Sequence, residues 1–317
     1  MSPIGSIVRS SSNHLVLTAH PGESFTARTL RLDVRPLMDP AIQAQAPVVV
    51  ETLDLAPRTP ESATLLVRIQ AETALFPADS DNDMNAVDNL PAQRRGIAGT
   101  VEAIAGCAGE FDIGDAVFGV TSASPFRAGQ LTVIEARSLA RMPSRLRFKD
   151  AASSSLAGAS AWKMLFAAGR LDSGETVLIL GANTPIGAFA VQLAAVHGVR
   201  TIALVTSPGN ERELLSYGAH CVIDASPGRL ETQCRSVSLV VDAVGGALHR
   251  RAAAALQSGC TLVSCVQRPE VFIVSRRRTR SLFCVPDATT HCLARIATLI
   301  DDGHITTCAT GSEPCRD

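Results

Sequence analysis

Residues 178–187, LILGANTPIG, have the pattern of a strand that ends in a tight turn and enters a helix. Turns of this kind hold the pyrophosphate of a dinucleotide, because free N–H groups and the helix dipole attract an anion. The usual fingerprint places three glycines there, and in this chain the three positions read Ala182, Thr184 and Gly187. Gly187 allows close packing of helix on strand, whereas the Cβ of Thr184 narrows the approach to a phosphate.

Polar side chains could replace the missing glycines. The Thr184 hydroxyl and the Asn183 amide can each donate a hydrogen bond to a phosphate. Pro185 suits the first helical position, where a missing N–H costs little. The residues predicted to contact the cofactor here are Gly181, Ala182, Asn183, Thr184, Pro185, Ile186 and Gly187. The alternative is a strand–helix turn that binds nothing.

The end of the next strand bears on which nicotinamide cofactor is bound. NAD sites place Asp or Glu about 20 residues further on, where it holds the ribose 2′-hydroxyl. Residues 206–212, TSPGNER, have no acid at the tip of the turn and end in Arg212. Hydroxyl, amide and guanidinium groups accept a 2′-phosphate, so NADPH is favoured over NADH, although Glu211 and Glu213 weaken the argument. The predicted contacts in this segment are Ser207, Pro208, Gly209, Asn210 and Arg212.

Strands alternate with helices around these two turns. Predicted strands cover 176–180, 200–206, 221–224, 239–244, 260–266 and 281–286, and predicted helices cover 149–169, 185–198, 209–219, 247–259 and 287–303. This alternation predicts βαβ units and a parallel sheet. Asp287 is the expected N-cap of the last helix and Gly303 its C-terminal stop.

The first half of the chain is mostly β, with glycine turns at short spacing. We therefore expect a substrate domain at 1–148, a nucleotide-binding Rossmann domain at 149–303 and a short C-terminal remnant at 304–317. Three further residues have structural interpretations. Asp242 ends the fourth predicted strand, where a structural hydrogen bond fits better than proton transfer, and Trp162 and Tyr217 are expected to pack against apolar neighbours.

Composition excludes several classes of function. The 317 residues are 46% hydrophobic and carry a net charge of −1, which gives no electrostatic basis for binding nucleic acid or an anionic membrane. Aromatic residues are only 4%, which argues against base stacking. No apolar run approaches the roughly 18 residues of a membrane span, and the N-terminus lacks the pattern of a signal peptide. We expect a cytoplasmic protein.

The nine cysteines argue neither for a disulfide framework nor for a zinc site. Their number is odd, and no pair has the C-x2-C spacing of a zinc site. The seven histidines are scattered, with no pair at ligand spacing. We therefore predict no metal, and we expect most of the cysteines to be small buried residues.

Eight blocks of sequence occur in the order typical of a known family. They are LLVRIQAETALFPADS (65–80), GIAGTVEAIAG (96–106), FDIGDAVFGVT (111–121), LAGASAWKMLF (156–166), TVLILGANTPIGAFAVQLAAVHG (176–198), LLSYGAHCVIDA (214–225), VVDAVGG (240–246) and IATLIDDGHI (296–305). Together they resemble the zinc-independent medium-chain dehydrogenase/reductases, which include quinone oxidoreductases and trans-acting enoyl reductases of fungal polyketide pathways. The resemblance implies a doubly wound Rossmann sheet plus a mostly β GroES-like substrate domain.

The resemblance also bears on cofactor and metal. In the enoyl-reductase branch a Ser-Thr pair often stands in the phosphate turn, and Asn183-Thr184 looks like that variant. A Ser-Pro-x-Asn segment holds the 2′-phosphate in that branch, and Ser207-Pro208-Gly209-Asn210 matches it, which supports NADPH. Zinc-binding members of the superfamily carry Gly-His-Glu where this chain has Arg94-Arg95-Gly96.

Two departures from the family concern the substrate side. Phe76-Pro77-Ala78-Asp79 stands in place of Asn-Pro-x-Asp, which exchanges a polar contact near the nicotinamide for an aromatic one. The family continues beyond the position of Ile305, so we expect the substrate domain to lack its closing segment. Asp79, Thr121 and Ser122 are expected to line the cleft, but the sequence assigns no catalytic residue.

The resemblance implies hydride transfer from NADPH to a small molecule, either an α,β-unsaturated carbonyl or a quinone, and secondary metabolism is one setting for it. A homodimer is an assembly that it allows. The alternative is a catalytically impaired protein that binds NADPH as a sensor or a partner subunit.

Overall fold

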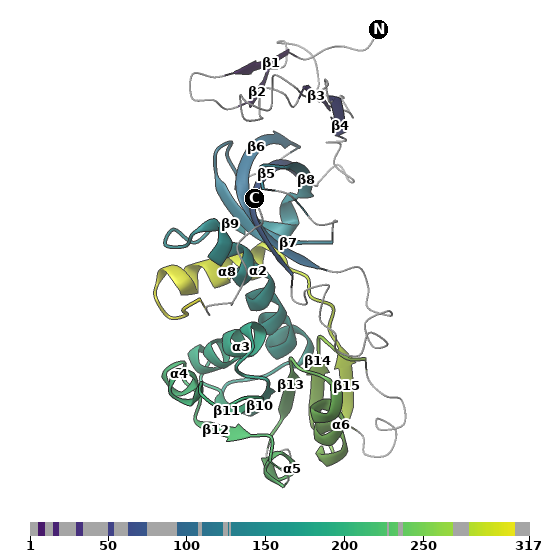
Figure 1. The fold of residues 1–317 in the computed structure, drawn as a ribbon, viewed down its shortest axis with the longest axis vertical. Coiled ribbons are helices and arrows are strands. Elements are labelled where there is room, and N and C mark those ends of the chain that lie inside the picture. The colour runs from purple at the N-terminus through teal and green to yellow at the C-terminus, as the bar shows by residue number, and fades with distance from the viewer. Residues whose placement is uncertain are drawn as a thin grey trace.

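The computed structural model describes residues 63–74, 94–106, 110–122, 126, 128–226, 228–233, 237–268 and 279–307, with the strands of residues 6–9, 15–18, 30–33 and 50–53 before them. These strands, β1 (Ser6–Arg9), β2 (Leu15–Thr18), β3 (Leu30–Asp33) and β4 (Val50–Leu53), form two antiparallel pairs, β1–β2 and β3–β4. The rest of the described chain builds a five-stranded antiparallel sheet and a six-stranded parallel sheet. Helix α2 (Phe148–Trp162) connects the two sheets (Figure 1).

The parallel sheet is formed by β10 (Thr176–Leu180), β11 (Arg200–Val205), β12 (Cys221–Asp224), β13 (Leu239–Asp242), β14 (Thr261–Ser264) and β15 (Arg280–Phe283). Its strand order is β12-β11-β10-β13-β14-β15. This is the order of a doubly wound dinucleotide-binding sheet, which confirms the predicted Rossmann fold. In such sheets the ligand binds at the carboxyl ends of the strands where the order reverses, which here is the crevice between β10 and β13.

Helices cover both faces of this sheet, because its central strands carry apolar side chains on both faces. Val177 and Ile179 of β10 belong to a buried cluster that includes side chains of α2, α3 (Pro185–Val196), α4 (Glu211–Ser216) and α8 (Thr290–Asp301). Leu178 and Leu180 point to the other face, where they join a second cluster with side chains of α5 (Arg229–Gln233) and α6 (Gly246–Ala255). The alternation along one strand thus fixes which helices lie on which face.

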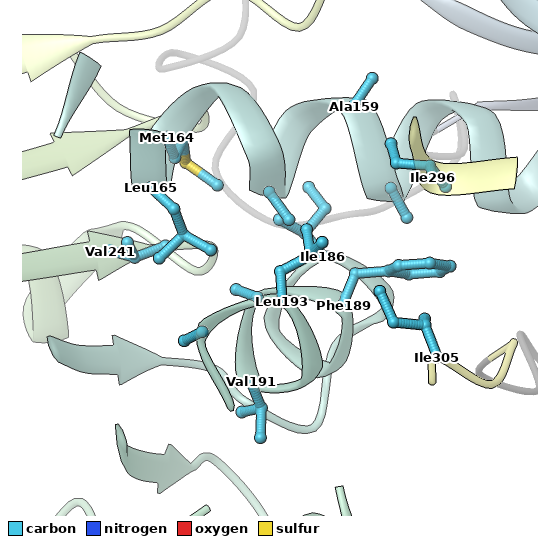
Figure 2. Packing of buried hydrophobic residues seen from close by; sticks show 14 of the residues in the cluster. Ala159, Met164, Leu165, Ile186, Phe189, Val191, Leu193, Val241, Ile296 and Ile305 are labelled. Carbon is cyan, nitrogen blue, oxygen red and sulfur yellow. The ribbon is translucent and has the colours of Figure 1, made fainter. Parts of the chain in front are cut away.

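The larger cluster packs three helices together (Figure 2). Ile186, Phe189 and Leu193 of α3 are buried beneath α2, and Figure 2 shows Ile305 beside the Phe189 ring. Gly158 in α2 makes room for this contact, since a Cβ there would lie 3.2 Å from a methyl of Ile296 in α8. The N-terminal turn of α3 is therefore held by packing on two other helices.

The antiparallel sheet has the order β8-β5-β6-β7-β9. Its strands are β5 (Thr64–Ala74), β6 (Arg95–Ala105), β7 (Ala116–Thr121), β8 (Leu131–Glu135) and β9 (Leu139–Arg141). A 3-10 turn, η3 (Ala136–Ser138), joins β8 to β9. Helix α2 packs on β6 so closely that a Cβ at Gly96 would overlap the carbonyl oxygen of Ala152. This sheet is consistent with the expected GroES-like fold.

The last helix begins three residues later than the sequence predicts. Thr289, and not Asp287, caps α8, because its side chain accepts a hydrogen bond from the Cys292 N–H. The Asp287 carboxylate instead pairs with Lys163 at 2.5 Å, at the start of the π-helical turn η4 (Lys163–Ala168) that follows α2. Gly303 ends the helix region with a positive φ of 76°, as predicted.

Candidate cofactor site

The turn after β10 is held by glycines at two positions. Gly181 has φ +74°, a conformation that favours glycine. At Gly187 a Cβ would overlap the carbonyl oxygen of Gly181 and would lie 2.7 Å from the Cα of Ala182. Helix α3 therefore begins directly against the turn, which confirms the packing role predicted for Gly187.

Thr184 is the N-cap of α3. It has extended backbone angles, and its hydroxyl oxygen accepts a hydrogen bond from the Gly187 N–H at 3.1 Å. The same hydroxyl donates its hydrogen to the carbonyl of Gly181 at 2.8 Å. A contact from this hydroxyl to a phosphate would require it to turn away from that carbonyl. Ile186, at the second helical position, keeps an N–H that has no acceptor within the helix.

Asn183 ties the turn to the end of β11. Its Oδ1 accepts hydrogen bonds from the Thr206 N–H at 3.1 Å and from the Thr206 hydroxyl at 3.2 Å, and its Nδ2 donates to Ser207 Oγ at 3.1 Å. One amide hydrogen of Asn183 and the hydroxyl hydrogen of Ser207 are not used in these bonds. Two segments that the sequence analysis linked only through a cofactor are thus joined directly.

The loop after β13 forms the other wall of the crevice, and a buried carboxylate holds it. Asp242 is 0% exposed. Its Oδ1 accepts the Val244 and Gly245 N–H groups at 3.0 and 2.8 Å, and its Oδ2 accepts bonds from His249 Nδ1 at 2.7 Å and Ser264 Oγ at 2.8 Å. These contacts confirm the structural interpretation of Asp242.

The protonation of Asp242 follows from these contacts. Burial on its own raises the pKa of a carboxyl group. Here the hydrogen bonds from His249 and from the Gly245 N–H outweigh burial and hold the pKa of Asp242 below its ordinary value. The carboxylate therefore stays ionised, and it fixes two backbone N–H groups of the loop beside the crevice. The sequence analysis missed His249, whose only signal is its place on the helix after Asp242.

The two walls touch each other. A Cβ at Gly181 would overlap the Cγ2 atom of Val244, so the glycine at the end of β10 makes room for the valine that follows β13. Val244 is 37% exposed. Since β10 and β13 are neighbours in the sheet, this contact lies at the point where the strand order reverses.

A small pocket of about 80 Å³ lies between the turn and α4. Its lining includes Asn183, Thr184, Asn210, Glu213 and Tyr217. The Glu213 carboxylate accepts hydrogen bonds from the Tyr217 hydroxyl at 2.7 Å and from Asn210 Nδ2 at 3.2 Å. Tyr217 also packs on the main cluster, as predicted.

Sequence reasoning missed the part that Glu213 plays in this pocket. A signal was present, because positions 210, 213 and 217 follow the three- and four-residue spacing of one helix face.

The remaining predicted site residues lie apart from this pocket. Pro208, Gly209 and Arg212 are exposed in the segment after β11, and the Gly209 N–H donates to the Glu211 carboxylate at 3.2 Å. Thr121 ends β7 opposite Arg95, followed by the exposed Ser122. Asp79 and its neighbours lie outside the described residues, so the predicted cleft residues stay predictions.

Other chemistries have little support in the described part of the chain. No group of three His, Cys, Asp or Glu side chains within it could hold a metal ion. Four of the described cysteines are buried, namely Cys260, Cys265, Cys284 and Cys292. Burial raises the pKa of each thiol, for example to about 11 for Cys260, so these are poor nucleophiles and confirm the expected packing role. None of the described helices has the length and apolar character to cross a membrane.

A parallel sheet in the Rossmann order with a glycine-bounded strand–helix turn at its switch point, joined to an antiparallel sheet, is the arrangement of dinucleotide-binding folds. Residues 185–276 match the family model described as "Zinc-binding dehydrogenase". The chain is 29% identical over 168 residues to the mitochondrial NAD(P)H oxidoreductase RTN4IP1 of Danio rerio, covering 49% of this chain and 43% of the relative. It is 32% identical over 155 residues to a quinone oxidoreductase of Pseudomonas aeruginosa, covering 47% of each.

The fold likeness extends further along the chain. The Escherichia coli quinone oxidoreductase, solved in complex with NADPH, superposes with a TM-score of 0.61 at 20% identity, covering 83% of this chain and 87% of that one. The described chain has the fold of the medium-chain alcohol dehydrogenases and quinone oxidoreductases, and about half of its sequence is similar to curated quinone oxidoreductases. It spans less than half the length of the two curated relatives above.

Proposed function

We propose that this protein is an NADPH-dependent oxidoreductase that reduces a quinone or an α,β-unsaturated carbonyl compound. The observation that carries the proposal is the glycine-bounded turn at the switch point, where Gly187 lets α3 begin against Gly181. The relatives support it, since one is named a quinone oxidoreductase and a protein of the same fold was solved with NADPH.

The residues of the turn fit the phosphates of a dinucleotide. Gly187 lets α3 begin directly against Gly181, and α3 is a helix of 12 residues whose dipole favours an anion at its start. Among the described residues of the turn and the end of β11, the donors include the N–H of Ile186 and the remaining hydrogens on Asn183 and Ser207. Thr184 contributes by capping α3, the helix that carries the Ile186 N–H.

The segment after β11 would hold the 2′ end of the cofactor. Ser207, Asn210 and Arg212 supply neutral and cationic donors there, as the sequence indicates, and Pro208 and Gly209 shape the turn between them. When bound, NADPH supplies the hydride for the reaction. The part of this chain is to orient the nucleotide, with the Val244–Gly245 loop and its Asp242 anchor forming the opposite wall of the crevice.

The test combines a binding titration with turnover. The purified chain is titrated with NADPH and NADH, and NADPH oxidation is then followed by nicotinamide absorbance with a panel of quinones and enones. We expect NADPH binding and turnover on at least one acceptor. Binding without turnover on any acceptor would favour the alternative of an NADPH-binding sensor or partner subunit, and absence of NADPH binding would exclude both.

We also propose the domain division that the sequence indicates. The chain leaves the antiparallel sheet after β9, and α2 begins at Phe148, so the proposed boundary between 148 and 149 falls at the first residue of this helix. Residues 304–307 of the expected C-terminal remnant return to α3, where the Thr306 N–H donates to Gln192 Oε1 at 2.7 Å. We further propose that the site binds no zinc and that the protein forms a homodimer. We also propose a cytoplasmic location, although one similar protein is named as mitochondrial.

A further inference from the structure

A negative charge lies beside the segment that would receive the 2′ end of the cofactor. The Glu213 carboxylate lines the pocket between α3 and α4, together with Asn183 and Asn210. Its two oxygens accept hydrogen bonds from the Tyr217 hydroxyl and from Asn210 Nδ2. The carboxylate is therefore positioned by two side chains, although the Glu213 residue itself is exposed.

The position of the ribose follows from the sheet. In a doubly wound sheet the pyrophosphate lies at the first strand–helix turn, and the 2′ group of the adenosine ribose lies at the end of the neighbouring second strand. Here β11 is that second strand, paired in parallel with β10. Its end is joined to the turn by the bonds of Asn183 to Thr206 and Ser207. The Glu213 carboxylate is bonded to Asn210, three residues beyond Ser207.

We infer that Glu213 is a specificity-determining residue that weakens the binding of NADPH relative to NADH. The inference rests on the proposed function, which places a nicotinamide nucleotide in this crevice. The Asn210 amide donates one hydrogen to the Glu213 carboxylate and would offer its other hydrogen to a 2′-phosphate. The two anions would then lie close together, and like charges repel. A ribose 2′-hydroxyl carries no charge and meets no such penalty.

Other charges in the segment do not cancel this effect. Arg212 is exposed and adds a positive charge, but Glu211 stands next to it and accepts the Gly209 N–H. The described segment from Thr206 to Tyr217 thus carries two acids and one base. Glu213 differs from Glu211 because it lines the pocket and because Asn210, a predicted contact of the 2′ group, is bonded to it.

The test is Glu213→Gln, measured by the dissociation constants of NADPH and NADH for the full chain. Glutamine has almost the same shape and still accepts from Tyr217, but it removes the charge. We expect NADPH to bind about five- to tenfold more tightly, as expected for a doubly charged phosphate several ångströms from a carboxylate near water. NADH affinity should stay within about twofold, and the gain for NADPH should shrink in high salt, since salt screens exposed charges.

Two matched variants separate charge from packing. Glu175→Gln makes the same change in charge at the opposite end of β10, just before Thr176, and should leave both affinities unchanged. Tyr217→Phe removes one hydrogen bond from Glu213 but keeps its charge, so it should not tighten NADPH binding. If Tyr217→Phe strengthened NADPH binding as much as Glu213→Gln does, the mobility of the Glu213 side chain, and not its charge, would control NADPH affinity. The inference would then be wrong.

The outcomes also separate this inference from the proposed function. If NADPH binds and Glu213→Gln leaves the NADPH-to-NADH ratio unchanged, or changes both affinities equally, this inference fails while the proposed function stands. If neither nucleotide binds to the unmodified chain or to Glu213→Gln, both fail.

Discussion

The turn after β10 and the loop after β13, which form the two walls of the crevice, are stabilised by different interactions. The turn after β10 is held by neutral groups that stay partly exposed, namely a threonine cap and an asparagine bridge. The loop after β13 is held by the carboxylate of Asp242, which is fully buried and accepts four hydrogen bonds. The turn after β10 therefore depends on close approach of its backbone to α3, whereas the loop after β13 depends on a carboxylate that is buried away from water.

This difference teaches what each wall can tolerate. Exposed hydrogen bonds exchange with water, so losing one costs little, whereas a buried polar group left without partners costs its full desolvation. The first wall should therefore respond to steric changes at its glycines and hardly to its polar side chains. The second should respond strongly to any change of charge. Four predictions follow this contrast, from the largest effect to the smallest.

Gly187→Val attacks the backbone approach and should have the largest effect. A Cβ there overlaps the Gly181 carbonyl, so α3 would have to move away from the turn. We expect a loss of about 5 kcal/mol in the free energy of unfolding and nucleotide affinity below detection. Urea unfolding and an NADPH titration measure both. Gly187→Ala, which adds only the Cβ, should fold but bind NADPH more weakly than the unmodified chain does. Unchanged NADPH affinity in both variants would refute the placement of the phosphate site.

Asp242→Ala should cost about 3 to 5 kcal/mol, because it leaves His249, Ser264 and two backbone N–H groups buried without their acceptor. The matched control is Asp224→Ala at the end of β12, where the carboxylate is exposed and bonds to the Ser226 N–H. That change should cost far less. Equal losses in urea unfolding for the two variants would show that burial does not distinguish these strand ends.

The pH dependence of stability sharpens the same contrast. The folded-state pKa of Asp242 lies below the ordinary value of 3.8, so the ionised carboxylate stabilises the fold fully at pH values above 3.8. This stabilisation is lost as the pH falls below 3.8 toward the folded-state pKa. The loss should approach about 1.4 kcal/mol per pH unit for this one group. Unfolding is compared between the unmodified chain and Asp242→Asn from pH 6 to pH 2, which spans the range below 3.8 where the loss is expected. Parallel curves for the two proteins would contradict the assignment.

Local pattern was enough to predict the turn, the βαβ units of a parallel sheet and the packing role of Gly187, because each follows from neighbouring residues and chain-wide alternation. The doubly wound arrangement of that sheet was implied by the family resemblance. Contacts over long separations were not predictable. Asp287 was wrongly expected to cap α8, because Lys163, 124 residues away, takes its carboxylate, and Thr289 caps the helix instead. The bonds of Asp242 with Ser264 and of Asn183 with Thr206 also join separate strands, and no local pattern indicates them.

Thr184→Ala should have the smallest effect and a revealing one. The variant removes the N-cap of α3, so we expect a loss of about 1 kcal/mol in urea unfolding, and Thr184→Ser, which keeps the hydroxyl, should recover most of it. It also frees the Gly187 N–H, which now donates to the threonine oxygen, for a phosphate. NADPH affinity should therefore stay within about twofold or rise. A tenfold loss of affinity with unchanged stability would mean that the threonine contacts the phosphate directly, and that this wall, like the other, depends on its side chains.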